Sequence, residues 1–465
     1  VLDEPDDFGL EDLPALCRLV NWAGMLGSKV LLSTATISPE LSSALFAAYQ
    51  QGRIQYTKVN GEKGESSTIC CVWFDEFNKP ISQSVSKLED FKTNHELFIM
   101  QRIHKLNNDI PSLRKAKIIP INDDGQKPIQ AFSKTIHEAI NQLHKSNNVK
   151  HSTKKKVSIG LIRMANIDPL VAVSKQLYAM KPDKDTNIYY CVYHSQYPLA
   201  LRSKIEEELD KALTRHNDEA WWADGDIGQR ISSNKIQNHI FVVLATSVAE
   251  VGRDHDYDWA IVEPSSMRSI IQLAGRIQRH RKQIPKSENI YILDKNYKAL
   301  KGHSPAYLRP GYESHKRRYF NTQMSELLNE DEYNSVSAIP RIKNIFPPFS
   351  LTEEDPPRFK KFNELEHIIQ KIKLFGNTNE ENCAKLWWEK DVTWCGDIQR
   401  NQPFRQSQEM DDYNLNKTYH EKLIWQKKKP REYPSKYELT RNIKTILTSD
   451  LKIAKGNAPW FSLSI

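Results

Sequence analysis

The stretch IFVVLATSVAEVGRD at residues 240–254 indicates the fold class of this chain. It begins with an unbroken apolar run, which is typical of a strand buried on both faces of a parallel sheet, and then changes to a polar loop that contains a glycine. Other short apolar runs lie on both sides of it, separated by amphipathic stretches. The apolar runs are 157–162, 188–192, 259–262 and 290–293, and the helix-like stretches are 170–180, 199–213 and 270–279. Short buried strands that alternate with helices predict an α/β fold with a parallel sheet.

The rest of the chain is organised around this series. Residues 1–147 repeat the alternation, so we expect a first α/β lobe there and a second lobe at 148–294. The additional apolar runs are 29–32, 68–74 and 117–121, and the additional helix-like stretches are 40–50, 85–106 and 132–143. The polar part of 141–167 carries six basic residues and no acidic one, which favours an interdomain linker. Beyond residue 294 the alternation fades and proline becomes frequent, so we expect a linker and a carboxyl-terminal accessory domain at 295–465.

Composition excludes several classes of protein. With 465 residues, 39% of them hydrophobic and 27% charged, the chain is long enough for more than one domain and too apolar to be disordered throughout. No apolar run approaches the ~20 residues that cross a bilayer, so we expect no membrane helix. Six cysteines without a Cys-x-x-Cys pair predict reduced thiols and a cytoplasmic location. A net charge of +8 permits a polyanionic partner without identifying one. Because the sequence starts at Val1 without an initiating methionine, we expect a fragment of a longer protein.

Adjacent carboxylates follow the first apolar residues, in the order Asp3-Glu4-Pro5-Asp6. Ligands of α/β sheets bind at the carboxyl ends of strands, which is where this turn is expected. Phosphoryl transfer needs one carboxylate for Mg²⁺ and a neighbour that orients or deprotonates the attacking water. Asp3 is the candidate for the metal and Glu4 for the water. The alternative is a solvated acidic loop after a strand.

A second polar turn follows the strand-like residues 30–32 and reads Ser33-Thr34-Ala35-Thr36. Its small hydroxyl side chains could hydrogen-bond the loop that contains Asp3 and relay the state of that loop to a second domain. The alternative is an ordinary strand-to-helix turn with a Ser or Thr cap.

The loop after the central strand is suited to anions. Its backbone amides and the Thr246 hydroxyl can hydrogen-bond a phosphate, and the Asp254 carboxylate can bind a sugar or an arginine. The dipeptide His255-Asp256 just after it is found in metal nucleases, but the sequence has no further His or Asp cluster at ligand spacing to support a metal there.

The stretch 272–281 is rich in arginine. If it is helical, Gln272, Gly275, Arg276 and Arg279 share one face, and such a face can clamp a γ-phosphate across an interdomain cleft. The alternative is a solvated basic helix.

Taken in order, these four elements resemble motifs II, III, V and VI of the superfamily 2 helicases. Within that superfamily the chain is similar to the helicase part of the CRISPR-associated type I helicase-nuclease. Arg163-Met-Ala-Asn166 is similar to motif IV of that family, and Tyr193-His-Ser-Gln-Tyr197 with Arg202 and Glu206 is similar to its His-Ser element. The wording Asp-Glu-Pro-Asp-Asp-Phe favours the type I-F branch. The resemblance covers roughly residues 1–294.

The resemblance implies two RecA-like lobes that use ATP and Mg²⁺ to move along single-stranded DNA, in the 3′ to 5′ direction. The DNA is the displaced strand of an R-loop, and the partners are a Cascade-type surveillance complex and a His-Asp nuclease domain that degrades invading DNA. The residue roles that it implies are catalysis for Asp3, Glu4, Arg276 and Arg279; ATP binding for Asp6, Gln272, Gly252 and Asp254; coupling for Thr34 and Thr36; DNA binding for Arg163, Asn166, His194 and Thr246; and Mg²⁺ binding for Asp3.

The sequence also departs from the family. It contains no Gly-x-x-x-x-Gly-Lys-[Ser/Thr] phosphate-binding loop, which in the family precedes motif II, and no His-Asp nuclease domain. We therefore expect the first RecA-like lobe to be incomplete and this chain alone to be inactive as an ATPase. Two alternatives stay open, a non-catalytic module that binds DNA and the surveillance complex, and another superfamily 2 DNA helicase. In the accessory region, Trp387, Trp388 and Trp394 are interpreted as core residues and Lys427–Lys429 as a solvated basic turn, with single-strand binding as the alternative.

Overall fold

The computed structural model describes most of the chain. The described residues are 1–61, 68–108, 110–122, 125–150, 154–216, 225–233, 235–250, 252–345, 358–376, 383–389, 413–417, 423–427, 438–439 and 451–461. The predictions for Trp394, Lys428 and Lys429 lie outside these residues. In the described part, no helix is both long enough and apolar enough to cross a membrane.

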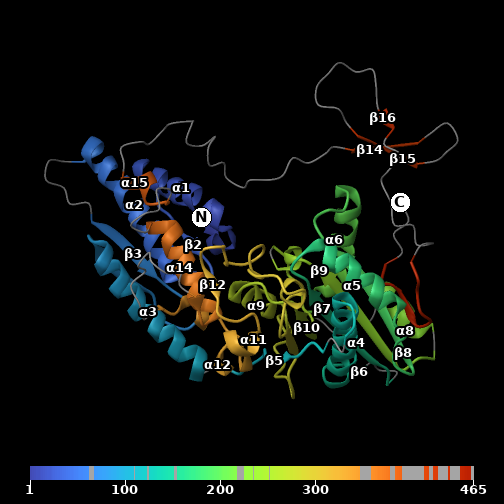
Figure 1. The fold of residues 1–465 in the computed structure, drawn as a ribbon. Coiled ribbons are helices and arrows are strands. Elements are labelled where there is room, and N and C mark those ends of the chain that lie inside the picture. Colours follow the sequence, from blue (N-terminus) through green and yellow to red (C-terminus); the bar gives the residue numbers. More distant parts are fainter. Residues whose placement is uncertain are drawn as a thin grey trace.

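The largest element is an eight-stranded, mostly parallel sheet, which confirms the predicted α/β fold class (Figure 1). Its strands run in the order β17-β8-β9-β7-β10-β11-β5, and β6 pairs with β7 in the antiparallel sense. Their bounds are β5 Ala116–Ile119, β6 Val149–Lys150, β7 Lys156–Arg163, β8 Thr186–Tyr193, β9 Asn238–Ala245, β10 Trp259–Val262, β11 Ile290–Leu293 and β17 Asn457–Pro459. β7, β9 and β10 are buried almost throughout because the sheet is covered on both faces.

Helices cover the two faces of this sheet. The helices are α4 Pro128–Ser146, α5 Ile167–Ala179, α6 Leu199–Leu213, α8 Gly225–Ser232, α9 Met267–Ala274 and α10 Tyr297–Leu300. Side chains alternate along β7, so that Ile159 and Leu161 join the core under α6, α8 and α9, whereas Ile162 joins the core under α4 and α5. The sheet therefore has two separate hydrophobic cores, one on each face.

The amino-terminal part is a smaller α/β unit. A two-stranded parallel sheet joins β1 (Leu2–Asp3) to β2 (Leu32–Ser33). The helices α1 (Leu13–Met25) and α2 (Pro39–Asn60) pack closely, since a Cβ atom on Gly52 would lie only 2.1 Å from the Asn21 carbonyl oxygen. The strands β3 (Ile69–Trp73) and β4 (Ile81–Val85) form an antiparallel pair against α3 (Leu88–Asn108).

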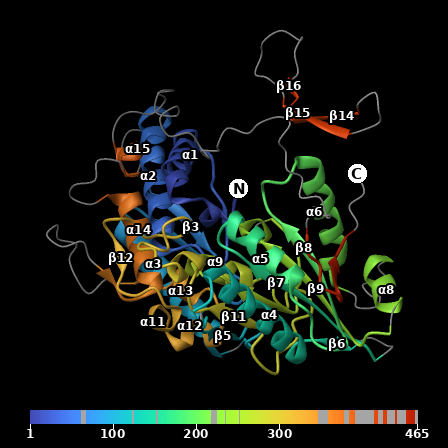
Figure 2. The ribbon, with the colours of Figure 1, turned by 45° about the vertical axis from the view of Figure 1, so that its right-hand side comes forward.

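One part of the accessory region packs on the amino-terminal part. Figures 1 and 2 show α14 (Phe362–Phe375) among the amino-terminal helices, and its Leu374 shares a core with α1 and α2. Trp388, in α15 (Leu386–Glu389), is buried in that core, as predicted. The remaining elements are η1 Pro5–Asp7, η2 Leu10–Asp12, η3 Ser247–Ala249, β12 Arg318–Tyr319, α11 Met324–Leu327, α12 Glu330–Asn334, α13 Ile339–Ile342, β13 Arg358–Phe359, β14 Tyr413–Lys417, β15 Leu423–Lys427 and β16 Glu438–Leu439.

The predicted domain organisation can be compared with the structure at several places. The predicted linker stays a prediction, although its described residues include the end of α4 at Ser146 and the strand β6, which pairs with β7. The apolar run that we placed in the first lobe contains β5, which completes the large sheet beside β11. β17, from the predicted accessory region, pairs with β8 at the other edge. The division at residues 147 and 294 stays a prediction, and the large sheet extends past both boundaries. Lys427 ends a strand, β15, rather than starting a turn.

Candidate active site between the two sheets

The acidic turn lies at the carboxyl end of β1. Asp3 ends the strand, and Glu4 takes the left-handed backbone conformation (φ 44°, ψ 56°), which non-glycine residues rarely adopt. The Glu4 amide donates a hydrogen bond to the Ser33 carbonyl oxygen at 2.7 Å, so β2 fixes the turn. Asp3 and Glu4 are exposed, whereas Asp6 is only 1% exposed. The two carboxylates predicted for the metal and the water therefore face solvent.

The structure brings the second polar turn against this acidic turn. The Thr36 hydroxyl donates to Asp6 Oδ2 at 2.5 Å, and the Thr34 hydroxyl donates to Asp6 Oδ1. The predicted hydrogen bonds to the loop that contains Asp3 are thus present, and Asp6 is their acceptor. Desolvation by the surrounding turn raises the pKa of the Glu4 carboxyl, and the charge of Asp6 raises it further. A carboxylate with a raised pKa is a stronger proton acceptor for water.

Helix α9, beside the large sheet, reaches the same turn. The Gln272 amide donates to Asp7 Oδ1, and Arg268 Nη1 donates to the Asp6 carbonyl oxygen at 2.7 Å and to that of Phe8 at 3.4 Å. Burial raises the pKa of Asp7, although the charge of Arg268 opposes this shift. Sequence reasoning identified Gln272 but missed Asp7 and Arg268. Arg268 lies one helical turn before Gln272, so the helical spacing that selected Gln272 could have found it.

Helix α9 is shorter than predicted. It ends at Ala274 with Gly275 as its C-cap, so Gln272, Arg276 and Arg279 do not share a helix face, and that prediction is wrong. The physical reason is a competing backbone pairing with Tyr257, whose amide donates to the Arg276 carbonyl oxygen at 3.0 Å and whose carbonyl oxygen accepts from the Gln278 amide at 3.1 Å. Arg276 and Arg279 therefore lie on a loop after α9, which we call the arginine loop. Its backbone pairs with Tyr257, in the segment between β9 and β10.

Both arginines contact the loop that follows β9. Arg276 Nη2 donates to the Glu250 carbonyl oxygen at 2.5 Å, and its Nη1 donates to that of Arg253. Arg279 Nε donates to Asp254 Oδ1 at 2.6 Å, so Asp254 has the arginine partner that we considered for it. Gly252 lies in this loop, between Glu250 and Arg253, with φ +68°, a conformation that glycine adopts without strain.

Under the arginine loop lies a buried ion network that the sequence did not reveal. Arg281 pairs with both oxygens of Asp256 at 2.8 and 2.9 Å and with Asp258 Oδ1 at 2.6 Å. Asp256 also accepts the backbone amides of Arg279 and His280 at 3.2 and 3.3 Å. Arg215 Nη1 donates to Asp258 Oδ1 at 3.1 Å. Burial alone would raise the pKa of Asp258, but the charges of Arg215 and Arg281 hold it below its ordinary value. Asp256 thus positions the backbone of the arginine loop.

Three of the four DNA-side candidates are buried. Arg163 is 3% exposed, and its Nε donates to Glu250 Oε1 at 2.7 Å, an oxygen that also accepts from the Ser269 hydroxyl at 2.6 Å. His194 and Thr246 are 8% and 7% exposed. Asn166 is half-buried and donates to a carbonyl oxygen of the accessory region at 3.3 Å. In this conformation Arg163 joins the elements around α9, and direct DNA contact by these residues stays a prediction.

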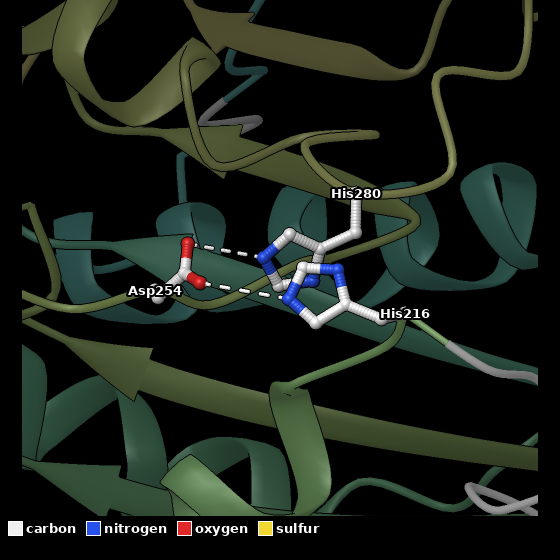
Figure 3. Close-up of side chains that lie close together, drawn as sticks. All are labelled: His216, Asp254 and His280. Atoms are coloured by element: carbon white, nitrogen blue, oxygen red, sulfur yellow. Dashed lines mark ion pairs between the residues drawn. The ribbon is translucent and has the colours of Figure 1, made fainter.

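His216, Asp254 and His280 form a cluster whose ligand atoms lie within 4.8 Å of one another (Figure 3). The surroundings of His280 argue against a metal there. Its Nδ1 accepts the Arg215 amide at 3.1 Å, which places the ring proton on Nε2, the atom that lies 3.0 Å from Asp254 Oδ1. A metal would need a lone pair on that atom. The neighbouring His280 and Arg279 instead hold the pKa of Asp254 at about 2.

The acidic turn has donors that suit Mg²⁺. Hard divalent cations prefer carboxylate oxygens and water, and Asp3 and Glu4 offer exposed carboxylates beside Asp6 and Asp7.

Comparison with known proteins gives the family. Residues 156–282 match the family model of the CRISPR-associated nuclease/helicase Cas3, C-terminal. A CRISPR-associated nuclease/helicase Cas3 of subtype I-F/YPEST from Pectobacterium atrosepticum is 47% identical over 430 residues, which is 89% of this chain and 38% of the relative. The protein of the same description from Pseudomonas aeruginosa is 39% identical over 412 residues, which is 87% of this chain and 37% of the relative.

A crystal structure of T. fusca Cas3 aligns with a TM-score of 0.40 at 16% identity, over 63% of this chain and 29% of that one. The chain spans 38% and 37% of the length of the two curated relatives, so it corresponds to a part of them. The matched segment contains both the loop after β9 and the arginine loop. The predicted family is confirmed to this extent: the chain corresponds to a part of the CRISPR-associated nuclease/helicase Cas3 proteins that it matches.

Proposed function

We propose that this chain is the part of an ATP-dependent single-stranded DNA translocase that closes the ATP site from the second lobe. The observation that carries the proposal is the contact of α9 with the acidic turn, where Gln272 reaches Asp7 and Arg268 reaches the Asp6 carbonyl oxygen. These two segments lie more than 250 residues apart in sequence: the acidic turn follows β1 of the small sheet, and α9 packs on the large sheet. A site divided in this way can change when the two sheets move relative to each other, which is what ATP-driven movement requires.

In this proposal Asp3 holds Mg²⁺, which supplies charge stabilisation to the phosphates when it is bound. Glu4 orients the attacking water and accepts its proton, a role that its raised pKa favours. Arg276 and Arg279 leave their carbonyl and carboxylate partners on the loop after β9 to meet the γ-phosphate. Gly252 and Asp254 complete the nucleotide side, and the bonds of Thr34 and Thr36 to Asp6 report the state of the acidic turn.

The names of the relatives extend the proposal to the biological setting. Both are described as CRISPR-associated nuclease/helicases, so we assign this chain to the degradation of invading DNA in the cytoplasm, together with a nuclease domain and a Cascade-type surveillance complex. The DNA is the displaced strand of an R-loop, on which Arg163, Asn166, His194 and Thr246 act once the second lobe opens.

The test is DNA-stimulated ATP hydrolysis by the protein isolated from its native source, in whatever length the cell makes it. Glu4→Gln and Arg276→Ala should each lower kcat at least 100-fold, because each removes a group that acts in the transition state. Lys134→Ala, an exposed residue of α4, is the matched control. Unchanged turnover in both site variants would refute the assignment of roles.

A second candidate function is a non-catalytic module that binds DNA and the surveillance complex. Three cations and the exposed Phe320 ring at the strands β12 and β13 are compatible with it. Salt-dependent binding of single-stranded DNA by a native protein of 53.9 kDa that hydrolyses no ATP would establish this candidate instead.

A further inference from the structure

A small two-stranded ribbon in the accessory region has faces of opposite character. β12 and β13 are parallel, with Arg318 opposite Arg358 and Tyr319 opposite Phe359. Tyr319 and Phe359 point inward and are 6% and 1% exposed. Because successive side chains of a strand point to opposite faces, the two arginines lie side by side on the outer face.

Two further residues extend this outer face. The Phe320 amide donates to the Phe359 carbonyl oxygen at 3.0 Å, which continues the pairing, and the Phe320 ring is 59% exposed. Lys360 follows Phe359 and is exposed. We call Arg318, Phe320, Arg358 and Lys360 the ribbon face. It combines three cations with one bare aromatic ring.

Stability does not explain the ribbon face. Like charges directly opposite each other on paired strands cost free energy, and an exposed phenylalanine ring contributes little to the core. Within the described ranges, no carboxylate pairs with Arg318, Arg358 or Lys360. Among the described residues, these three side chains make one hydrogen bond, from Arg318 Nε to the His315 carbonyl oxygen at 3.3 Å. The guanidinium and ammonium groups therefore keep most of their donors for a partner.

We propose that the ribbon face is a contact site for single-stranded DNA. The three cations neutralise backbone phosphates, and the Phe320 ring stacks on an unpaired base. A duplex offers phosphates but no unpaired base face, and an acidic protein segment needs no exposed ring. The choice of DNA as the polymer rests on the proposed function, whereas the ribbon face itself rests on the geometry above.

The ribbon connects to the candidate active site through α14. The Tyr319 ring packs on Phe362 at 5.3 Å, and its hydroxyl donates to the Phe362 carbonyl oxygen at 3.1 Å. Farther along α14, the buried Glu366 accepts the amide of Met267, the first residue of α9. In this proposal, a shift of the ribbon on DNA binding would reach α9, which contacts the acidic turn, through α14.

The experiment is fluorescence anisotropy of a labelled oligo(dT) strand with this chain at several salt concentrations. The triple variant Arg318→Ala/Arg358→Ala/Lys360→Ala should bind more weakly and should depend less on salt. Its negative slope of log K against log salt should decrease in magnitude by about 2, since each phosphate contact on a single strand contributes ~0.7. The matched control is Lys58→Ala/Lys79→Ala/Lys134→Ala, which removes the same charge from exposed positions elsewhere.

Phe320→Ala tests the stacking separately. It should weaken oligo(dT) binding about fivefold or more, and Phe320→Trp should restore it. On an abasic strand of equal length, Phe320→Ala and the wild type should bind equally, because no base is present to stack.

Four outcomes would overturn the proposal. If the triple variant and its control lose affinity equally, the ribbon face is not a specific contact. If Phe320→Ala weakens both strands equally, the ring does not stack on a base. If the wild-type chain binds no single strand at low salt, the proposed function fails together with the ribbon face, whereas intact wild-type binding with unaffected variants removes the ribbon face alone.

Discussion

The buried pair of Arg281 and Asp256 gives a prediction about stability. Arg281→Met keeps an unbranched stem as long as that of arginine up to Nε and removes the guanidinium, which supplies two of the four hydrogen bonds that Asp256 accepts. Asp256 is 0% exposed, so its carboxylate would stay buried with two backbone amides as its remaining donors. Breaking one partner of a buried ion pair costs about 3–5 kcal/mol, and we expect the free energy of unfolding to fall by that amount.

The assay is urea unfolding followed by tryptophan fluorescence, to which Trp259, 0% exposed in the adjacent strand β10, contributes as one of ten tryptophans. A double-mutant cycle with Asp256→Asn separates the pair from its surroundings. The asparagine keeps an oxygen that can accept the backbone amides, so the double variant should be more stable than the sum of the single effects predicts, by at least about 1.5 kcal/mol. A loss below about 1 kcal/mol for Arg281→Met, or simple additivity, would refute the view that this pair stabilises the arginine loop.

Two further predictions concern the amino-terminal part. Burial lowers the pKa of His95 to about 4, below its ordinary value of 6.5, so the unfolded chain binds a proton more readily and stability should fall by up to about 3 kcal/mol as the pH falls from 6.5 to 4. His95→Gln, which keeps an acceptor for the Trp73 indole, should flatten this part of the profile of urea midpoint against pH, and an unchanged profile would contradict the assignment. Gly52→Ala should destabilise the chain by about 1–3 kcal/mol, because its Cβ would lie 2.1 Å from the Asn21 carbonyl oxygen. Gly9→Ala, whose Cβ would meet its nearest atom at 3.8 Å, is the control for thermal unfolding, and equal melting temperatures would refute the close packing of α1 and α2.

The central strands could be predicted from the sequence because burial on both faces makes them apolar at every position. The runs at 157–162, 188–192, 240–244, 259–262 and 290–293 all lie in strands of the large sheet. Membership of a sheet is harder to predict. The run at 117–121 has the same local pattern as the strands of either lobe, and only its pairing with β11 decides where it belongs.

The candidate site shows the same division between local and distant information. The hydroxyl turn at Thr34 could be matched to the acidic turn because both follow neighbouring parallel strands. The end of α9 could not be predicted, since the helical pattern continues to Arg279 and the competing partner, Tyr257, lies about 20 residues earlier in the chain. Arg163 was assigned to DNA by resemblance, and its burial depends on Glu250, which is 87 residues away.

Helix α9 is the element through which these sites can influence one another. It is only eight residues long, about 12 Å, yet three different parts of the chain hold it. Glu366 of α14 binds its first residue, the acidic turn binds Arg268 and Gln272 in its middle, and the arginine loop starts at its end. A short helix with so many polar contacts cannot rotate or slide without breaking several of them together, because neighbouring positions are ~100° apart around its axis. Movement of the acidic turn on nucleotide exchange must therefore also move the arginine loop or α14, which gives the proposed ATP site a direct mechanical route to the ribbon face.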